Sequence, residues 1–257
     1  MARTMLTLTA AVALIYLALC ATLFIFQRSL IYFPQPRSLS PGTSMFTLPV
    51  DGAVLVVTTR PLQGSTTVKG ALIYFGGNAE DVSYSLPDLA AAFPDHAIYL
   101  LHYRGYGGST GAPSEAAIIA DALALFDKVY AEHKNIVVVG RSLGSGVAVQ
   151  LASQRPAARL VLVTPYDSIA EIAARQFPYF PVRWLLQDKF ESFKTAPKIT
   201  VPTLIIAAEH DEVISRASTD ALFNSFRAGV AEFKVVARTG HNTISDSPEY
   251  IPLLTGA

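Results

Sequence analysis

The sequence has little of two features that often reveal a function, namely cysteine and net charge. It contains one cysteine among 257 residues, Cys20, so it can form neither an internal disulfide framework nor a cysteine metal site. Lysine plus arginine and aspartate plus glutamate number 20 each, which gives neither a basic nucleic-acid-binding surface nor an acidic tail. No H-E-x-x-H motif for a zinc hydrolase occurs. Because the charges balance, we expect no nucleic-acid partner.

Charge is also missing from the apolar residues 5–26. As a helix this stretch would be roughly 33 Å long at ~1.5 Å per residue, enough for a bilayer core of about 30 Å. A cleavable signal peptide is the alternative, but its apolar region is usually ~7–15 residues long, and residues 27–30 offer no small-residue cleavage site. We expect residues 1–27 to be a single-pass anchor in the lipid bilayer. The flanking charges, Arg3 against Arg28, do not decide its orientation.

Residues 28–43 follow the apolar stretch and contain several prolines, which should end the helix and begin an extended linker. Tyr32 and Phe33 stand near the start of this linker. They would suit the membrane interface, where aromatic residues are enriched, and they would equally suit packing on the folded domain. Both interpretations stay open from the sequence.

Residues 44–257 fit one α/β domain better than two domains. Short apolar runs predict strands, and the helical stretches between them predict a mostly parallel sheet flanked by helices. The clearest helix is at residues 114–134, where Ser114 is a good N-cap and Glu115 suits the positive helix start. The predicted strands are residues 53–59, 71–75, 97–102, 136–139, 160–164, 203–208 and 233–237.

One segment, residues 165–198, interrupts this alternation. It contains the aromatic and proline-rich stretch 177–186, soon after a predicted core strand. We expect it to form a small cap inserted into the domain after the sixth strand. An aromatic-rich cap would suit an acyl or other apolar substrate group, and packing of the cap on the domain would explain the same aromatics.

A G-x-S-x-G motif, Gly140-Arg141-Ser142-Leu143-Gly144, lies between a predicted strand and a small-residue helical stretch. This is the context of a nucleophile elbow, in which a strained turn exposes the serine hydroxyl above the sheet. The two glycines leave room for neighbouring backbones, and a side chain at either would clash. An inert strand-to-helix turn is the alternative. We predict that Ser142 is a nucleophile.

A serine nucleophile needs a histidine base and a carboxylate that orients it, in the chain order serine, acid, histidine. Asp211 and His241 each follow a predicted strand, so both lie at the carboxyl ends of strands, where catalytic groups of parallel sheets gather. Of the five histidines, only His241 has both this order and this position. We predict Asp211 and His241 as the partners of Ser142, with Asp167 as the second candidate for the acid.

The negative oxygen of an acyl-transfer intermediate also needs hydrogen-bond donors, and losing one typically costs on the order of 3–4 kcal/mol. The Leu143 N–H, directly after the serine, is one candidate. Gly76-Gly77-Asn78-Ala79 follows another strand, and glycine there would let the backbone turn the Asn78 N–H inward. An ordinary Gly-Gly turn is the alternative. We predict Asn78 and Leu143 as oxyanion donors.

Together these motifs resemble the α/β-hydrolase superfamily, especially its single-pass, membrane-anchored serine hydrolases. The resemblance implies an eight-stranded, mainly parallel sheet, Ser142 with Asp211 and His241 as the catalytic triad, and Asn78 and Leu143 as oxyanion donors. Two positions depart from the family pattern, because Gly76 stands in place of a histidine and His102 in place of an aspartate. The matching residues are Phe75-Gly76-Gly77-Asn78-Ala79, Tyr103-Arg104-Gly105-Tyr106-Gly107-Gly108-Ser109, Pro113-Ser114-Glu115, Gly140-Arg141-Ser142-Leu143-Gly144, Asp211 with Val213-Ile214, and Gly240-His241-Asn242.

These inferences predict a membrane-anchored serine hydrolase that cleaves a carboxylic ester or thioester through an acyl-enzyme. Because proteins that it resembles include lipid-ester hydrolases and protein depalmitoylases, we expect a lipid-derived acyl group in the substrate. An amide or peptide hydrolase of the serine aminopeptidase-like branch and a non-catalytic α/β-hydrolase-like binding protein are the alternatives. Since water and three side chains suffice for this chemistry, we expect no cofactor and no metal. We also expect a monomer.

Overall fold

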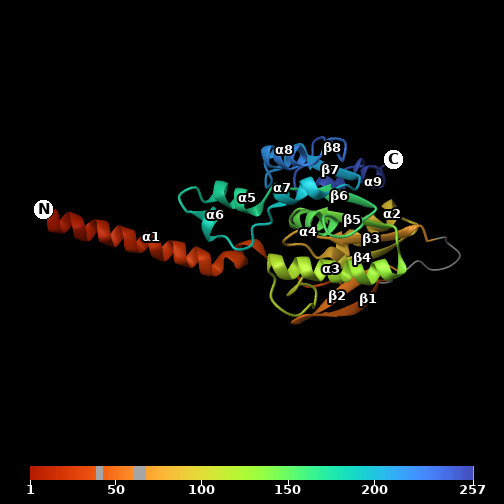
Figure 1. Ribbon diagram of the computed structural model, residues 1–257, viewed down its shortest axis with the longest axis horizontal. Coiled ribbons are helices and arrows are strands. Elements are labelled where there is room, and N and C mark those ends of the chain that lie inside the picture. Colours follow the sequence, from red (N-terminus) through yellow and green to blue (C-terminus); the bar gives the residue numbers. More distant parts are fainter. Residues whose placement is uncertain (39–42, 61–67, 257) are drawn as a thin grey trace.

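The computed structural model describes residues 1–38, 43–60 and 68–256, which include one eight-stranded sheet (Figure 1). The strand order is β1-β2-β4-β3-β5-β6-β7-β8. β2 runs antiparallel to both of its neighbours, and every other pair is parallel. This confirms the predicted mostly parallel, eight-stranded sheet flanked by helices. The strands are β1 (Ser44–Val50), β2 (Ala53–Arg60), β3 (Gly70–Phe75), β4 (His96–Leu101), β5 (Ile136–Arg141), β6 (Arg159–Val163), β7 (Thr203–Ala208) and β8 (Ala231–Val236).

Strand β1 is the one that the apolar runs of the sequence do not predict. It forms a sheet edge, alternates between exposed and half-buried residues, and contains Pro49. An edge strand tolerates proline because one row of its backbone groups needs no partner strand, and it needs no continuous apolar run. The other seven strands lie where predicted, with their ends shifted by at most two residues.

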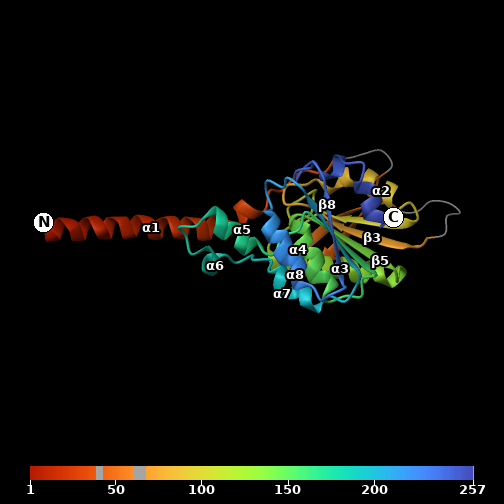
Figure 2. The ribbon, with the colours of Figure 1, turned by 90° about the horizontal axis from the view of Figure 1, so that it is seen from above.

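Helices cover both faces of the sheet (Figure 2). α3, α4 and α8 pack on one face, while α2 and α9 pack on the other. α3 begins as predicted, with the Ser114 hydroxyl accepting the Ala117 N–H at 3.3 Å. The helices are α1 (Ala2–Ile31), α2 (Leu86–Ala92), α3 (Glu115–Glu132), α4 (Leu143–Ala152), α5 (Ile169–Gln176), α6 (Val182–Leu185), α7 (Ser192–Thr195), α8 (Arg216–Ser225) and α9 (Tyr250–Thr255).

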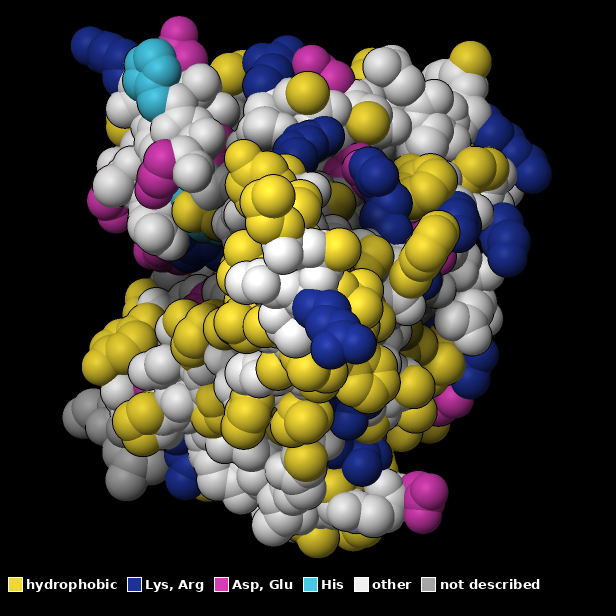
Figure 3. Space-filling view, turned by 90° about the vertical axis from the view of Figure 1, so that its left-hand side faces the viewer, with side chains coloured by type: hydrophobic (Ala, Val, Ile, Leu, Met, Phe, Trp, Pro, Cys, Tyr) yellow, Lys and Arg dark blue, Asp and Glu magenta, His cyan; other side chains and the backbone are white. Residues whose placement is uncertain are grey.

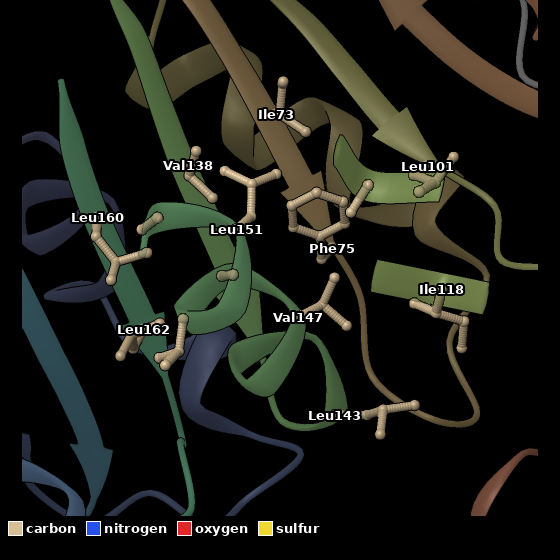
Figure 4. Packing of buried hydrophobic residues seen from close by; sticks show 14 of the residues in the cluster. Ile73, Phe75, Leu101, Ile118, Val138, Leu143, Val147, Leu151, Leu160 and Leu162 are labelled. Atoms are coloured by element: carbon tan, nitrogen blue, oxygen red, sulfur yellow. The ribbon is translucent and has the colours of Figure 1, made fainter. Parts of the chain in front are cut away.

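The core consists of two apolar layers, one on each face of the sheet. Strand β3 is buried along its whole length, and its side chains alternate between the layers, with Ile73 and Phe75 on one face and Leu72 and Tyr74 on the other. Val147 of α4 packs in the first layer, beside the start of its helix (Figure 4). This packing fixes α4 against β3 and β5, and so fixes the turn that carries Ser142.

Helix α1 projects from the domain (Figures 1 and 2). Among the described residues it is the one helix long and apolar enough to cross a membrane. It ends at Ile31, four residues beyond the predicted end of the anchor. The Arg28 guanidinium pairs with the Asp188 carboxylate at 3.0 Å, so the end of α1 is attached to the domain.

The predicted linker is also attached where it is described. Tyr32 is buried and donates its hydroxyl to Asp188 at 3.1 Å, which favours domain packing over the membrane interface for this residue. Burial and the nearby Asp188 carboxylate raise the pKa of the Tyr32 hydroxyl, so it remains a donor. Further along, the Gly107 N–H donates to the Gln35 carbonyl at 2.9 Å. The rest of the predicted linker, including Pro41, falls largely within residues 39–42, outside the described residues.

The predicted cap lies between β6 and β7, where α5, α6 and α7 replace the usual single crossover helix. Its α5–α6 part lies beside α1 in both ribbon views. There the Tyr16 hydroxyl donates to the Tyr179 carbonyl at 2.9 Å, and the Tyr16 ring stacks on Phe180. Packing does not explain all the cap aromatics, because Tyr179 is 85% exposed and Trp184 is 89% exposed.

Candidate active site

Ser142 occupies the turn between β5 and α4, with φ 49° and ψ −118°. A positive φ is uncommon for a residue with a side chain, and such strain costs on the order of 1–3 kcal/mol. The Ser142 N–H donates to the Val163 carbonyl at 2.9 Å, which ties the turn to the neighbouring strand β6. The structure thus contains the strained strand-to-helix turn that the motif predicts.

The two motif glycines allow the close approach of backbones that this turn requires. A Cβ atom at Gly140 would overlap the Gly144 carbonyl oxygen, and one at Gly144 would overlap the Phe75 carbonyl oxygen of β3. Because these neighbours are backbone atoms, they cannot rotate away as side chains do. Alanine at either position would push α4 away from the sheet.

Three predicted residues meet at this turn. His241 Nε2 lies 2.9 Å from Ser142 Oγ, and His241 Nδ1 lies 2.9 and 3.0 Å from the two Asp211 carboxylate oxygens. Since a carboxylate only accepts, Nδ1 carries the hydrogen and Nε2 is free to accept the serine proton. The His241 and Asp211 side chains are 6% and 8% exposed. The arrangement can therefore transfer a proton from serine to imidazole in a largely water-shielded position.

Backbone N–H groups hold the acid in place. Asp211 Oδ1 accepts from the N–H groups of Val213 and Ile214 at 3.0 and 2.7 Å. Asp167, the second candidate for the acid, is buried elsewhere and accepts a short hydrogen bond from the Ser218 hydroxyl. The structure thus places Asp211 on the imidazole and gives Asp167 a partner on α8.

Two charged side chains hold the histidine loop, and neither is predicted from the sequence. The Glu212 carboxylate accepts the His241 N–H at 3.0 Å, and this bond lowers the pKa of Glu212. The sequence pattern suggests only a solvated loop charge for Glu212. Arg141, inside the G-x-S-x-G motif, donates to the His241 and Asn242 carbonyls at 3.4 and 3.5 Å. Their position beside motif residues is the only signal that could have identified them.

The loop that carries Asn78 is held from three sides. The Asn78 carbonyl accepts from the Tyr106 hydroxyl at 2.6 Å and from the Phe33 N–H at 3.0 Å. The Tyr103 hydroxyl donates to the Gly76 carbonyl at 2.9 Å. These carbonyls point outward to their donors, and the described residues accept no hydrogen bond from the Asn78 or Leu143 N–H. Both N–H groups therefore keep their capacity to bind an oxyanion.

Glu80 is a third residue of the site that is not predicted from the sequence. Its Oε2 accepts the Gly77 N–H at 2.7 Å, and its Oε1 accepts from Tyr74 and Ser85 hydroxyls at 2.7 Å each. Glu80 thus closes the loop that carries Asn78. A side chain at Gly76, the position of the family histidine, would collide with Val82. The three-residue spacing between Gly77 and Glu80 was the available signal, but it is common in turns.

His102, the other departure from the family pattern, lies away from the triad. Its Nε2 is 2.8 Å from the Thr58 hydroxyl, and the residue is buried. Burial lowers the pKa of His102 from 6.5 to about 4, which Asp81 nearby opposes only in part. At pH 7 His102 is therefore an uncharged, buried side chain that forms a hydrogen bond within the domain.

An apolar pocket of about 280 Å³ leads to Ser142. Leu143 and Asn78 also line it, so the serine hydroxyl and both candidate oxyanion donors face the same space. Its other walls come from α1, from the cap and from the loop after β7. No charged side chain is found among the described residues that line it. The described residues also contain no group of three or more histidine, cysteine or acidic side chains that could hold a metal ion.

Comparison with known proteins identifies the fold family. A family model described as "alpha/beta hydrolase fold" matches residues 70–195. An uncharacterised protein of Mycobacterium tuberculosis is 34% identical over 251 residues, which cover 92% of this chain and 88% of that one. The lysophosphatidylserine lipase ABHD12 of Macaca fascicularis is 29% identical, over 69% of this chain and 53% of its own.

Solved structures share the fold. The Pyrococcus furiosus esterase Pf2001 superimposes with a TM-score of 0.71 at 17% identity, over 87% of this chain and 97% of the esterase. At such low identity the match shows a common architecture, and the function has to be inferred from the site itself.

Proposed function

Because the chain belongs to the α/β-hydrolase fold family, we propose that it is a membrane-anchored serine hydrolase that cleaves a carboxylic ester or thioester. One observation carries the proposal: an unbroken hydrogen-bonded series from Asp211 through His241 to Ser142 at the floor of an apolar pocket. An inert strand-to-helix turn would not need these three side chains together.

The reaction would follow the geometry. Ser142 Oγ attacks the carbonyl carbon while its proton passes to His241 Nε2, and Asp211 stabilises the resulting imidazolium. The Asn78 and Leu143 N–H groups bind the negative oxygen. The intermediate then collapses, His241 protonates the leaving alcohol or thiol, and the acyl group stays on Ser142. Water attacks this acyl-enzyme, gives its proton to His241, and releases the acid and the free serine.

The pocket favours an acyl group over a peptide. An aminopeptidase-like enzyme would need a carboxylate to bind the substrate's amino group, and the described lining residues include none. An apolar lining suits a hydrocarbon chain. The name of the relative ABHD12, a lysophosphatidylserine lipase, fits the same substrate class, an acyl ester of a lipid.

Helix α1 supports the anchored location. Its length and apolar composition suit a membrane span, and the Arg28–Asp188 pair joins its end to the domain. We therefore place the site close to one surface of the bilayer, with residues 1–27 as the anchor.

The test is hydrolysis of p-nitrophenyl butyrate and its thioester counterpart by the purified full-length chain in detergent. Ser142→Ala should lower kcat by roughly 10⁶-fold, because the nucleophile is lost. Ser153→Ala is the matched control, since this hydroxyl bonds only locally, to the Gln150 carbonyl on α4. Equal turnover by wild type and Ser142→Ala would reject the proposal.

A further inference from the structure

Helix α1 does more than hold the domain, because it forms part of the pocket. Leu23, Phe24, Gln27, Leu30 and Ile31 line the space above Ser142. Their spacing places them on one stripe of the helix, as expected for side chains that recur every three to four residues. A helix that served only as a tether would not need to face the reaction site.

The cap contacts α1 within the apolar part of this helix. Tyr16, which contacts Tyr179 and Phe180, precedes Gln27 by eleven residues, or about 16 Å at ~1.5 Å per residue. That is about half of a ~30 Å hydrocarbon core. With residues 5–26 across the bilayer, the α5–α6 part of the cap and this part of the pocket lie at the level of one leaflet.

Several polar groups in this region have partners that suit them to such a position. The Gln27 amide donates to the Phe24 carbonyl at 2.7 Å and accepts the Gln187 N–H at 2.7 Å. Arg183 and Glu171 pair through two hydrogen bonds of 2.7 and 2.8 Å, which lowers the cost of removing them from water. In the view along α1, hydrophobic side chains spread over the centre of the molecular surface (Figure 3).

We propose that the pocket opens sideways into one leaflet, so that the acyl chain of a membrane lipid slides between α1 and the cap to reach Ser142. This inference rests on the proposed function. The anchor helix is then also the chain-binding wall, with Ile31 close to the reacting carbonyl and Leu23 near the distal end. These two residues are separated by eight positions, or about 12 Å along the helix. A cavity of about 280 Å³ suits one acyl chain at a time.

The experiment adds bulk at the distal end of the pocket, on the wall formed by α1. Leu23→Trp is compared with Ile25→Trp, which adds the same side chain on another face of α1, where Ile25 is 69% exposed. The full-length variants are placed in vesicles of dialkyl ether phosphatidylcholine, a lipid without carboxylic ester bonds. kcat/KM is then measured for p-nitrophenyl palmitate and p-nitrophenyl butyrate. Reaction of Ser142 with a fluorophosphonate is measured in parallel.

We expect Leu23→Trp to lower the palmitate-to-butyrate ratio of kcat/KM by roughly tenfold or more, because the long chain loses its place while the short one does not reach it. Reaction of Ser142 with the fluorophosphonate shows that the variant folds. Ile25→Trp should keep the wild-type ratio. An unchanged ratio in Leu23→Trp, with Ser142 still reactive, overturns the inference alone. A wild-type chain that neither cleaves butyrate nor reacts at Ser142 overturns the proposed function, and the inference with it.

Discussion

The reaction site and the pocket that leads to it are built in opposite ways. Ser142, Asp211 and His241 lie on loops at strand ends, and each is fixed by hydrogen bonds from backbone groups or from the other two. The pocket walls are mostly apolar side chains from α1, the cap and the loop after β7, all outside the sheet. Under the proposed function, reaction chemistry and acyl selection would therefore be supplied by separate parts of the chain. Substitutions should therefore separate rate from chain-length preference.

After the loss of the nucleophile itself, the largest effect on rate should come from the acid. Asp211→Asn should lower kcat by about 10⁴-fold for short and long esters alike, because the imidazole loses the partner that fixes its tautomer. Asp167→Asn is the matched control, since Asp167 is also a buried acid but its carboxylate accepts from the Ser218 hydroxyl on α8. It should retain turnover and unfold at a lower temperature. If Asp167→Asn, and not Asp211→Asn, abolished turnover, the assignment of the acid would be wrong.

A smaller effect on rate should come from the loop that carries Asn78. Glu80→Gln removes one carboxylate oxygen that accepts from this loop, so the Asn78 N–H should be displaced. We expect kcat to fall by up to about 10²-fold, the low end for an oxyanion donor, with KM little changed. Asp88→Asn on α2 provides a nearby carboxylate control. A rise in KM with unchanged kcat would instead assign Glu80 to substrate binding.

A residue outside both regions should change stability without changing either property. The folded-state pKa of His102 is lowered from 6.5 to about 4, so the unfolded chain binds the proton first as pH falls. Stability is intact above pH 6.5 and should decrease by about 3 kcal/mol between pH 6.5 and 4. Thermal unfolding in detergent, followed by circular dichroism, measures this slope. His102→Gln should flatten it, and a wild-type slope in that variant would contradict the assignment.

The smallest effect is spectroscopic and concerns the cap. Trp184 is the single tryptophan of the chain and is 89% exposed on α6. In vesicles its emission should shift to the blue and should be quenched by lipids brominated on the acyl chain, because tryptophan prefers the bilayer interface. Emission that is quenched only by a water-soluble quencher such as iodide would place the cap outside the leaflet.

The same contrast explains how much could be predicted from the sequence. The reaction loops were predictable because each follows a buried apolar strand, and because a triad has a fixed chain order. The fold followed from these strands, apart from the edge strand β1, whose half-exposed residues carry no apolar run. The roles of Glu80 and Glu212 could not be predicted, because each depends on how a loop closes. The Glu80 carboxylate bonds an N–H of its own turn, and the Glu212 carboxylate bonds an N–H of a distant loop.

The pocket wall could not be predicted either. Leu23 belongs to a stretch whose apolar character is fully explained by a membrane span, and Ile31 lies in the predicted linker, so nothing in the pattern distinguishes the stripe that lines the pocket. The cap aromatics were equally ambiguous, because packing on the domain and contact with an apolar substrate group favour the same side chains. Tertiary contacts identify the lining stripe of α1 and place the Phe180 ring of the cap against Tyr16.

The most direct measurement maps the residue that reacts with a fluorophosphonate. The full-length chain is labelled, digested and sequenced by tandem mass spectrometry, which distinguishes Ser142 from its neighbour Ser145. A positive result is an adduct on Ser142 that disappears in Ser142→Ala and weakens strongly in His241→Ala. An adduct that forms on another serine, or that survives in both variants, would contradict the proposed catalytic site.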